Sequence, residues 1–477
     1  MKFKIYVLSI ALCLGFSACE KYLEVGNPKN ELPSTLAFSD DKTATASVSG
    51  IYVRMNQLNY QFANVLSMIL PAMSADEFVY AAAFATYDEF KNNAVLPSNS
   101  YVNTLWSQPY QYISQANMCI EGLEKATNLS PQVKAQLLGE AKFIRAFNYF
   151  YLVNFFGDVP LLLTSDITLN NVRQRDPQAD VYAAIIKDLQ EAKASLFDGY
   201  PSGVKTNVAA AERIRPNKAA ASALLARTYL YTKRWAEAES EASEVIKNQS
   251  YKLVSANDLE KTFQKNSVES IWQLQPVNIG GGRNTWEGFL IVPATATASP
   301  LFRMIPNYLY NAFEAGDKRD EKWVGKFVAS PTVTHKFPSK YKVRTATGTL
   351  QEYTMVLRLA EQYLIRAEAN YNLKKFDLAE GDINIIRNRA NLGSLSLANN
   401  EAEVRKALEQ ERRVELFGEW GHRWFDLRRW PSVTGTAGKT RADDILPALK
   451  AGWKPTAIYL PLPQSALLAN PNLTQND

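Results

Sequence analysis

Cys19 is the residue of this chain at which a specific chemical modification is most clearly predicted. Lys2 and Lys4 begin a segment that then carries no charge as far as Phe16, and small residues precede the cysteine. The apolar run is too short to cross roughly 30 Å of hydrocarbon, so it predicts an export signal and not a stable membrane anchor. A cysteine directly after the cleavage point is typical of bacterial lipoproteins, in which the new N-terminal thiol is acylated. The sequence therefore predicts an exported protein held to a membrane by lipid on Cys19.

This interpretation divides the beginning of the chain into two parts. Residues 1–18 are expected to be removed as a signal peptide, and residues 19–40 to form a tether. An ordinary secretory signal with an incidental cysteine is the alternative. Cys13 is a poorer lipidation site because it follows Leu12, which is too bulky for the cleavage position.

Two clusters of aromatic and polar residues have the composition that sugar binding requires. Flat aromatic faces stack on sugar rings, while amides, carboxylates and arginines form hydrogen bonds with the hydroxyls. The first cluster lies next to a glycine run and consists of Arg283, Asn284, Trp286 and Glu287. The second consists of Asp76, Tyr80 and Tyr87. Each ring has the alternative role of packing in the core. We expect Trp286 to be the better ligand contact, because its glycine-rich approach would leave the ring free to project.

A third group, in the C-terminal part of the chain, has the residue types of acid–base catalysis. Glu415, His422 and Asp426 lie close together in the sequence, but catalysis also needs reach and a tuned pKa. The same helix carries Arg412 and Glu419, and such charges can be satisfied by pairs three or four residues apart. We therefore interpret this group as structural, and we expect no catalytic residue.

Composition excludes several other classes of function. The chain has 53 Lys and Arg against 48 Asp and Glu, a net charge of +5 without a dense basic run, which argues against nucleic-acid binding. After processing, Cys119 would be the only cysteine besides Cys19, so a disulfide framework and a cysteine-based zinc site are not expected. Only two histidines occur, and Gly280 to Gly282 lack the Lys-Ser/Thr ending of a phosphate loop. No metal and no cofactor are therefore expected.

Helices are the elements that must position these residues. Ser130 can cap a helix that has Pro131 in its first turn, and Gly157 can end that helix with Pro160 just beyond. Apolar residues form two rows along this segment, which indicates burial on two sides, as in stacked helices.

Two further segments look like copies of one helix–turn–helix unit. Ala226 and Trp235 have the same spacing as Ala367 and Phe376, and the small residues fall where two helices would cross closely. This pattern resembles the tetratricopeptide repeat, whose units bury their faces only by stacking. A stacked array also accounts for a length of 477 residues, beyond the size at which a single compact core stops growing.

Two stretches have a different character. Residues from about 251 to 350 are rich in Gly, Pro, Thr and aromatics, with short strand-like runs such as residues 270–274. A second loop-rich stretch covers residues 72–103. Their aromatic content argues against simple disorder, and long irregular segments inside compact domains are usually functional.

Four sequence blocks, distributed in order over the chain, resemble the SusD/RagB family of nutrient-binding outer-membrane lipoproteins of Bacteroidetes. They are CEKYLE at residues 19–24, RAFNYF continuing into FGDVPL at 145–161, RLAEQYLIRAE at 358–368, and ERRVEL followed by GHRWFDLRRW at 411–430. The tail with LPLP at 460–463 and NPNL at 470–473 fits the same family.

The resemblance implies a mainly α fold, a tetratricopeptide-like helical superhelix with an irregular, loop-rich ligand-binding lobe that contains short β segments. Residues 41–477 would form this domain, with the lobe at about 251–350. The implied function is non-enzymatic binding of an oligosaccharide or other oligomeric nutrient at the outer membrane, facing the cell exterior, for delivery to a SusC-like TonB-dependent transporter. In the family the ligand surface is built from the two loop regions.

Two other functions remain alternatives. A glycoside hydrolase on a helical scaffold would need two carboxylates about 5 to 10 Å apart across a cleft, and no sequence pattern marks such a pair. A repeat-scaffold lipoprotein that binds only protein partners would lack a pocket lined by the two loop regions.

Overall fold

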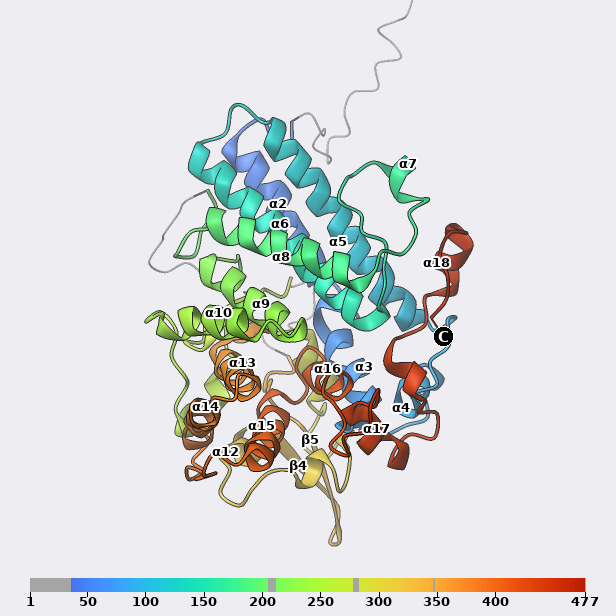
Figure 1. Ribbon diagram of the computed structural model, residues 1–477, viewed down its shortest axis with the longest axis vertical. Coiled ribbons are helices and arrows are strands. Elements are labelled where there is room, and N and C mark those ends of the chain that lie inside the picture. The colour runs from blue at the N-terminus through green and yellow to red at the C-terminus, as the bar shows by residue number, and fades with distance from the viewer. Residues whose placement is uncertain (1–35, 205–211, 278–282, 346–347, 477) are drawn as a thin grey trace, which may run out of the picture.

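The computed structural model describes residues 36–204, 212–277, 283–345 and 348–476, and helices dominate them (Figure 1). The expected mainly α architecture is confirmed. Residues 1–35, and with them the predicted signal and Cys19, lie outside the described residues.

The helices of the first half are α2 (Asp41–Met55), α3 (Ser67–Ser74), α4 (Ala85–Asn92), α5 (Ser100–Lys125), α6 (Pro131–Phe156), α7 (Ile167–Asn170), α8 (Gln178–Ser195), α9 (Lys218–Tyr231) and α10 (Trp235–Lys247). The helices of the second half are α11 (Trp286–Ile291), α12 (Lys318–Lys322), α13 (Leu359–Asn372), α14 (Phe376–Arg389), α15 (Glu401–Leu416), α16 (His422–Arg429), α17 (Arg441–Ile445) and α18 (Gln464–Ala469).

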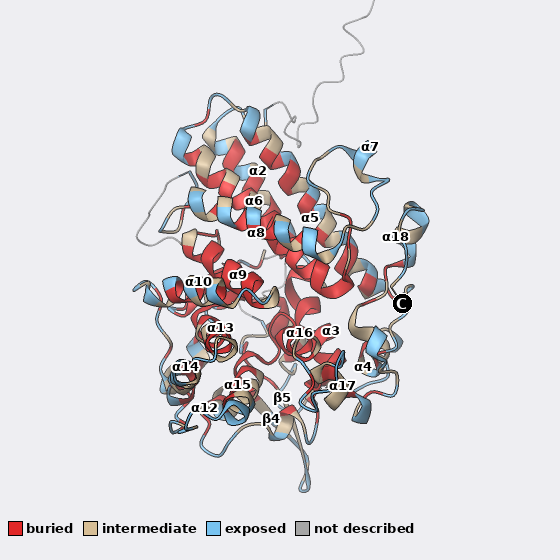
Figure 2. Ribbon diagram, viewed as in Figure 1, coloured by how far each residue is buried: buried red, intermediate tan, exposed pale blue. Residues whose placement is uncertain are grey.

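The long helix α6 lies at the centre of the N-terminal helical layer. It runs over 26 residues, packs against α5 and α8, and is buried along most of its length (Figure 2). The predicted start at Pro131 and end at Gly157 are confirmed, and Gly157 has a φ of 75°, which glycine adopts without strain. The expected side-chain cap is not formed. Ser130 instead donates its hydroxyl to the Asp41 carboxylate at 2.6 Å, which ties α6 to the start of α2.

The two predicted repeats are present as helix pairs. α9 packs on α10 and α13 on α14, while α10 contacts α13, so the pairs stack in sequence down one side of the molecule (Figure 1). Ala226 and Ala367 are fully buried, as close crossings of helices require. The tight turns after α9 and α13 each contain a lysine with positive φ, 59° at Lys233 and 62° at Lys374.

Among the described residues, three two-stranded antiparallel sheets lie within the irregular lobe or join it to neighbouring segments. β1 (Phe78–Tyr80) pairs with β3 (Phe302–Met304), β2 (Ser270–Leu274) with β6 (Thr354–Arg358), and β4 (Val324–Ser330) with β5 (Val333–Pro338). The strand expected at residues 270–274 is confirmed. The short π and 3-10 segments are η1 (Phe62–Leu66), η2 (Ala256–Lys261), η3 (Leu309–Asn311), η4 (Leu446–Ala448) and η5 (Pro455–Ile458). The stretch 72–103, expected to be loop, also contains α4, which ends at Asn93 in the left-handed conformation.

A buried network of arginines and carboxylates joins the lobe to the repeats. Glu415 of α15 accepts hydrogen bonds from Arg319 of α12, Arg358 of β6 and Arg389 of α14. All four side chains are at most 4% exposed. Removing one partner of a buried pair leaves an uncompensated charge and costs about 3–5 kcal/mol, so this network fixes the position of the lobe.

Candidate functional site

Six aromatic rings gather where the N-terminal loop region meets the irregular lobe, and we call them the aromatic cluster. Its members are Tyr60, Tyr80, Phe84, Tyr87, Tyr101 and Phe302. Tyr87 lies at the centre, with its ring centroid 5.0 Å from that of Tyr80, 4.8 Å from that of Phe84 and 5.4 Å from that of Tyr101. Tyr101 in turn stacks on Tyr60 at 5.8 Å with an interplanar angle of 25°.

Short local elements hold these rings in place. β1 pairs with β3 so that Tyr80 lies opposite Phe302, and their rings are 5.1 Å apart. α4 carries Tyr87, and Phe84 immediately precedes this helix. Asn99 caps α5 by accepting a hydrogen bond from the Tyr101 N–H at 3.0 Å. Its amide also donates to the Thr86 carbonyl and to Glu89 of α4, which sets the first turn of α5 against α4.

The aromatic cluster has a buried floor and an open rim. Tyr87 is 3% exposed, whereas Phe84 is 43% exposed and Tyr80 is half-buried. Burial raises the pKa of Tyr80 and of Tyr87, so both phenols keep their protons and remain hydrogen-bond donors. The rim therefore offers ring faces together with the neutral hydroxyl group of Tyr80, which is the chemistry that a sugar can use.

Asp76, predicted to face a ligand beside these tyrosines, is fully buried and engaged within the protein. It accepts hydrogen bonds from Arg423 at 2.8 and 2.9 Å and lies 3.0 Å from Arg413. Burial alone would raise its pKa, but the two guanidinium groups hold the pKa of Asp76 well below its ordinary value. Its two oxygens thus anchor the loop to α15 and α16, and the rings of Tyr80 and Phe84 carry the exposed chemistry nearby.

The structure also encloses most of the Trp286 cluster. Trp286 is 6% exposed, so the ring does not project as the glycine-rich approach led us to expect. The guanidinium carbon of Arg283 lies 4.5 Å from the ring centroids of both Trp286 and Phe289 and covers them. The glycines of residues 280–282 lie outside the described residues.

The polar members of the same cluster have internal partners. The side-chain oxygen of Asn284 accepts hydrogen bonds from the backbone N–H groups of Gln351 at 2.7 Å and Glu352 at 2.9 Å. Glu287 accepts a hydrogen bond from the Thr354 hydroxyl at 3.1 Å, and burial raises the pKa of Glu287 to about 7. Among the described residues, no ring of this cluster packs against a ring of the aromatic cluster, so the two predicted regions do not form one continuous aromatic surface.

Four members of the aromatic cluster were not among the candidates identified from the sequence, namely Tyr60, Phe84, Tyr101 and Phe302. Tyr60 precedes the stretch at 72–103 by more than a helical turn, and Tyr101 lies at its end. Their mutual stacking depends on the tertiary approach of η1 to α5, for which the sequence carries no local signal.

Family models match both halves of the chain. The model described as "SusD family" matches residues 316–477, and the model described as "Starch-binding associating with outer membrane" matches residues 21–230. The chain belongs to the SusD/RagB family.

Relatives and solved structures agree with this assignment. Two SusD-like proteins of Formosa agariphila are 23% and 25% identical to this chain, and each match covers at least 99% of both chains. A SusD superfamily structure from Bacteroides vulgatus superposes with a TM-score of 0.76 at 24% identity, covering 92% of this chain and 99% of that one. A structure titled "Laminarin binding SusD-like protein" has a TM-score of 0.74 at 26% identity, with the same coverage.

In this SusD-like protein the charged C-terminal group forms a structural framework, although its partners differ from those expected. Arg412 donates a hydrogen bond to Asp426 at 2.7 Å, and Arg358 donates one to Glu419 at 2.8 Å. These charges are therefore paired between different elements and not along α15. Burial lowers the pKa of His422 well below its ordinary value, and the positive charges of nearby arginines lower it further, so this imidazole stays neutral.

The described residues also bear on metal binding and on helices that could span a membrane. Within that part of the chain, no group of three or more His, Cys, Asp or Glu side chains is arranged to hold a metal ion. Nor is any helix there both long and apolar enough to cross a membrane.

Proposed function

We propose that this SusD-like protein binds glycans at the outer membrane, with the rim of the aromatic cluster as its primary contact surface. The observation that carries the proposal is the open group of rings around Tyr80 and Phe84, above a floor made by Tyr87. The family description as starch-binding and the laminarin-binding relative support a glycan as the ligand class.

The geometry of the rim suits a sugar chain. Tyr80 and Phe84 lie 6.2 Å apart, centroid to centroid, with their ring planes at 58°, so neighbouring units of a curved chain meet differently oriented faces. The partial exposure of the rings lets them stack without disturbing the floor, and a phenol beside the stacked face can donate to a hydroxyl.

We further propose that binding is not coupled to hydrolysis. Hydrolysis requires a carboxylic acid and a second carboxylate across the bound bond. Three carboxylates around the aromatic cluster have structural partners: Asp76 pairs with Arg423, Asp88 accepts a hydrogen bond from the Phe84 N–H at 3.2 Å, and Glu89 accepts one from the Asn99 amide at 2.7 Å. An incubation of the protein with the bound glycan should therefore release no reducing ends.

Binding is best tested by isothermal titration with laminarin and starch oligosaccharides. The Tyr80→Ala and Phe84→Ala variants should each lose about 1–2 kcal/mol of binding free energy with nearly unchanged melting temperatures. Phe327→Ala is the matched control, because Phe327 is a half-exposed ring of β4 that stacks on His335 and is not a member of the aromatic cluster. Unchanged affinity in both cluster variants would refute the assignment of the ligand to this surface.

Attachment through Cys19 and delivery to a SusC-like TonB-dependent transporter complete the proposal. Acylation of Cys19 would hold the protein at the membrane, where a transporter could receive the glycan. Cys19→Ala should move the protein from the membrane fraction to the soluble fraction, as measured by immunoblotting after a high-salt wash. A variant that stays in the washed membranes would contradict the lipid anchor, and failure to co-purify with the transporter would contradict delivery.

A further inference from the structure

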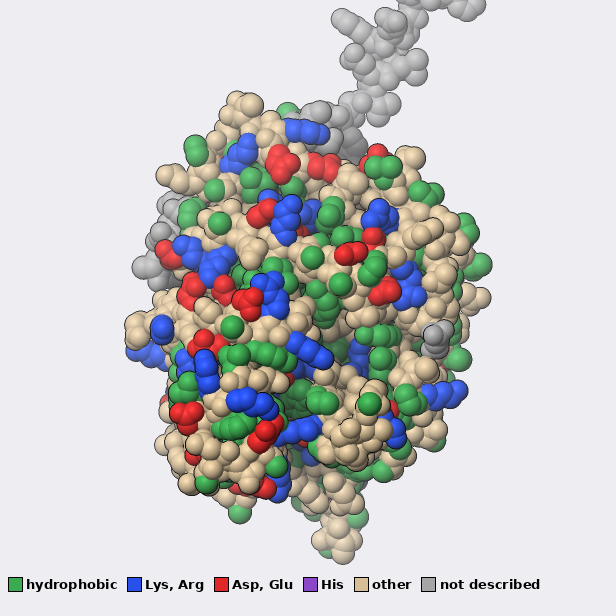
Figure 3. Space-filling view, viewed as in Figure 1, with side chains coloured by type: hydrophobic (Ala, Val, Ile, Leu, Met, Phe, Trp, Pro, Cys, Tyr) green, Lys and Arg blue, Asp and Glu red, His purple; other side chains and the backbone are tan. Residues whose placement is uncertain are grey.

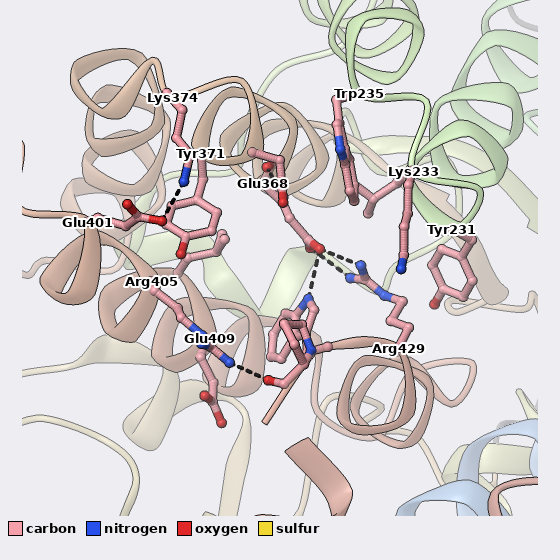
Figure 4. A pocket seen from close by; sticks show the side chains of 15 residues that line it. Tyr231, Lys233, Trp235, Glu368, Tyr371, Lys374, Glu401, Arg405, Glu409 and Arg429 are labelled. Atoms are coloured by element: carbon pink, nitrogen blue, oxygen red, sulfur yellow. Dashed lines mark hydrogen bonds and ion pairs between the residues drawn. The ribbon is translucent and has the colours of Figure 1, made fainter. Parts of the chain in front are cut away.

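A pocket of about 400 Å³ opens among the helical repeats, on the face shown in Figure 3, where a hollow lies over α13, α15 and α16. Its walls come from the turns after α9 and α13, from α15 and from the end of α16 (Figure 4). None of its lining residues belongs to the aromatic cluster or to the Trp286 cluster. The volume lies in the range of about 300–1,000 Å³ that is typical of small-molecule sites.

The internal repeat of the fold brings two lysines to this pocket. Lys233 lies seven residues after Ala226, and Lys374 lies seven residues after Ala367, so the two occupy equivalent positions in their helix pairs. Both residues have positive φ, and both line the pocket. Stacking of the two units therefore places two equivalent ammonium groups around one space.

The two lysines differ in how their charge is satisfied. Lys374 pairs with Glu401 at 2.5 Å. Lys233 forms no ion pair with any residue that the structure describes. In Figure 4 its ammonium group lies beside Arg429 and Tyr231, on the side of the pocket opposite Arg405.

The remaining pocket charges do not supply the missing anion. Arg405 donates to the backbone carbonyl of Pro431, a neutral acceptor. Glu368 accepts two hydrogen bonds from the Arg429 guanidinium, one of them at 2.7 Å, and a third from the Trp430 indole N–H at 2.7 Å. Glu409, which also lines the pocket, pairs with Arg423 and Arg441. Among the described residues, Lys233 and Arg405 therefore have no carboxylate partner.

Trp235 supplies a ring face beside this charge. It begins α10, two residues after Lys233, and is half-buried. Cations cover other rings of the pocket, since Arg429 lies 4.9 Å from the Tyr231 centroid and Lys374 lies 5.9 Å from that of Tyr371. Among the described side chains, no cation and no second ring packs on Trp235.

We propose that this pocket binds an acidic sugar unit, with its ring on Trp235 and its carboxylate or sulfate at Lys233. A free aromatic face beside an unpaired ammonium group suits a ring that carries an anion, and Arg405 and Glu401 can bond its hydroxyls. An extended acidic peptide fits less well, because the space is compact and bounded by four elements. The proposal rests on the proposed glycan-binding function and adds to it a second site that is selective for charge.

The test compares oligosaccharides that differ in charge. Isothermal titration of the soluble mature protein would use trigalacturonate, a sulfated galactose tetrasaccharide and neutral maltotriose. At least one acidic probe should bind, and Lys233→Met and Trp235→Ala should each weaken that binding about tenfold. Added salt should also weaken it, since the attraction is electrostatic. Tighter binding of trigalacturonate would identify a carboxylate as the preferred anion, and tighter binding of the sulfated tetrasaccharide would identify a sulfate.

Two controls separate this site from the surroundings. Lys375→Met removes an exposed lysine that follows Lys374 in the turn after α13 and does not line the pocket, and it should leave the affinity for the acidic probe unchanged. Tyr80→Ala should weaken binding of neutral glycan while acidic binding persists, so failure of the primary site and failure of this pocket give different results. Thermal melts of each variant identify losses that are caused by misfolding, and Lys233→Glu provides a second charge variant if Trp235→Ala unfolds.

Three outcomes would overturn the proposal. The first is an absence of binding by either acidic probe. The second is acidic binding that survives both Lys233→Met and Lys233→Glu. The third is equal or tighter binding of triglutamate with the same dependence on Lys233, which would make the pocket a site for acidic peptide.

Discussion

The two loop regions that the sequence marks as sugar-binding candidates have similar compositions and opposite exposures. Around Tyr80, the floor ring Tyr87 is buried while Phe84 remains 43% exposed. Around Trp286, the ring is 6% exposed and lies under the guanidinium of Arg283. The difference lies in what covers each region, since both contain aromatic, amide or carboxylate groups on irregular backbone.

This comparison shows that an aromatic side chain becomes a platform only where the fold leaves one face uncovered. Polar neighbours do not indicate exposure, because Asn284 and Glu287 are buried and hydrogen-bonded to residues of the segment 351–354. The Trp286 cluster thus has the connectivity of a packed core, and a role for it in ligand contact stays a prediction.

The largest effect that would sharpen this contrast is expected from Trp286→Ala. Removing a packed indole should lower the free energy of unfolding by about 3–5 kcal/mol, because it combines lost burial with a cavity. Chemical denaturation monitored by circular dichroism measures this loss. A stable variant with weakened glycan binding would reverse the comparison and make Trp286 a ligand platform.

A smaller, pH-dependent effect is expected from Glu287→Gln. Burial raises the pKa of Glu287 to about 7, so the folded protein holds this proton at pH values where the unfolded chain, with an ordinary pKa of about 4.3, has released it. The stability that this proton provides is complete below pH of about 4.3 and is lost as the pH rises toward 7. The variant should therefore gain on the order of 2 kcal/mol relative to the parent between pH 5 and pH 8.

Thermal melts of both proteins across this pH range provide the measurement for Glu287. The amide oxygen of glutamine can still accept the Thr354 hydroxyl, so packing changes little. Parallel stability curves would mean that Glu287 is hydrated, and therefore that the Trp286 cluster is open to solvent.

The smallest effect is expected from Arg283→Ala. Loss of the cation above Trp286 and Phe289 should cost about 1 kcal/mol of stability and leave glycan affinity unchanged. Arg344→Ala serves as a matched comparison, because that guanidinium lies 4.6 Å from the same Phe289 ring. A loss of glycan affinity in Arg283→Ala alone would show that the sugar reaches this cluster.

Local sequence signals predicted much of the scaffold. Helix α6 begins at Pro131 and ends before Gly157, as expected. The equal spacing from Ala226 to Trp235 and from Ala367 to Phe376 identified the stacked helix pairs. These signals work because helix termini and close crossings impose residue types at fixed positions along the chain. The candidate site was less predictable, since Tyr60 joins Tyr101 only through the tertiary contact of η1 with α5.

The sequence by itself determined the family, the helical class and the residue types available for binding, because these depend on motifs and on periodicity within single segments. Only the tertiary structure decided which rings are open and which charges are paired. Lys233 and Lys374 illustrate this point, since they occupy equivalent turns, yet Glu401 of a later helix neutralises one and not the other. Exposure and charge compensation depend on segments far apart in the sequence, and the position of those segments is set by packing of the whole core.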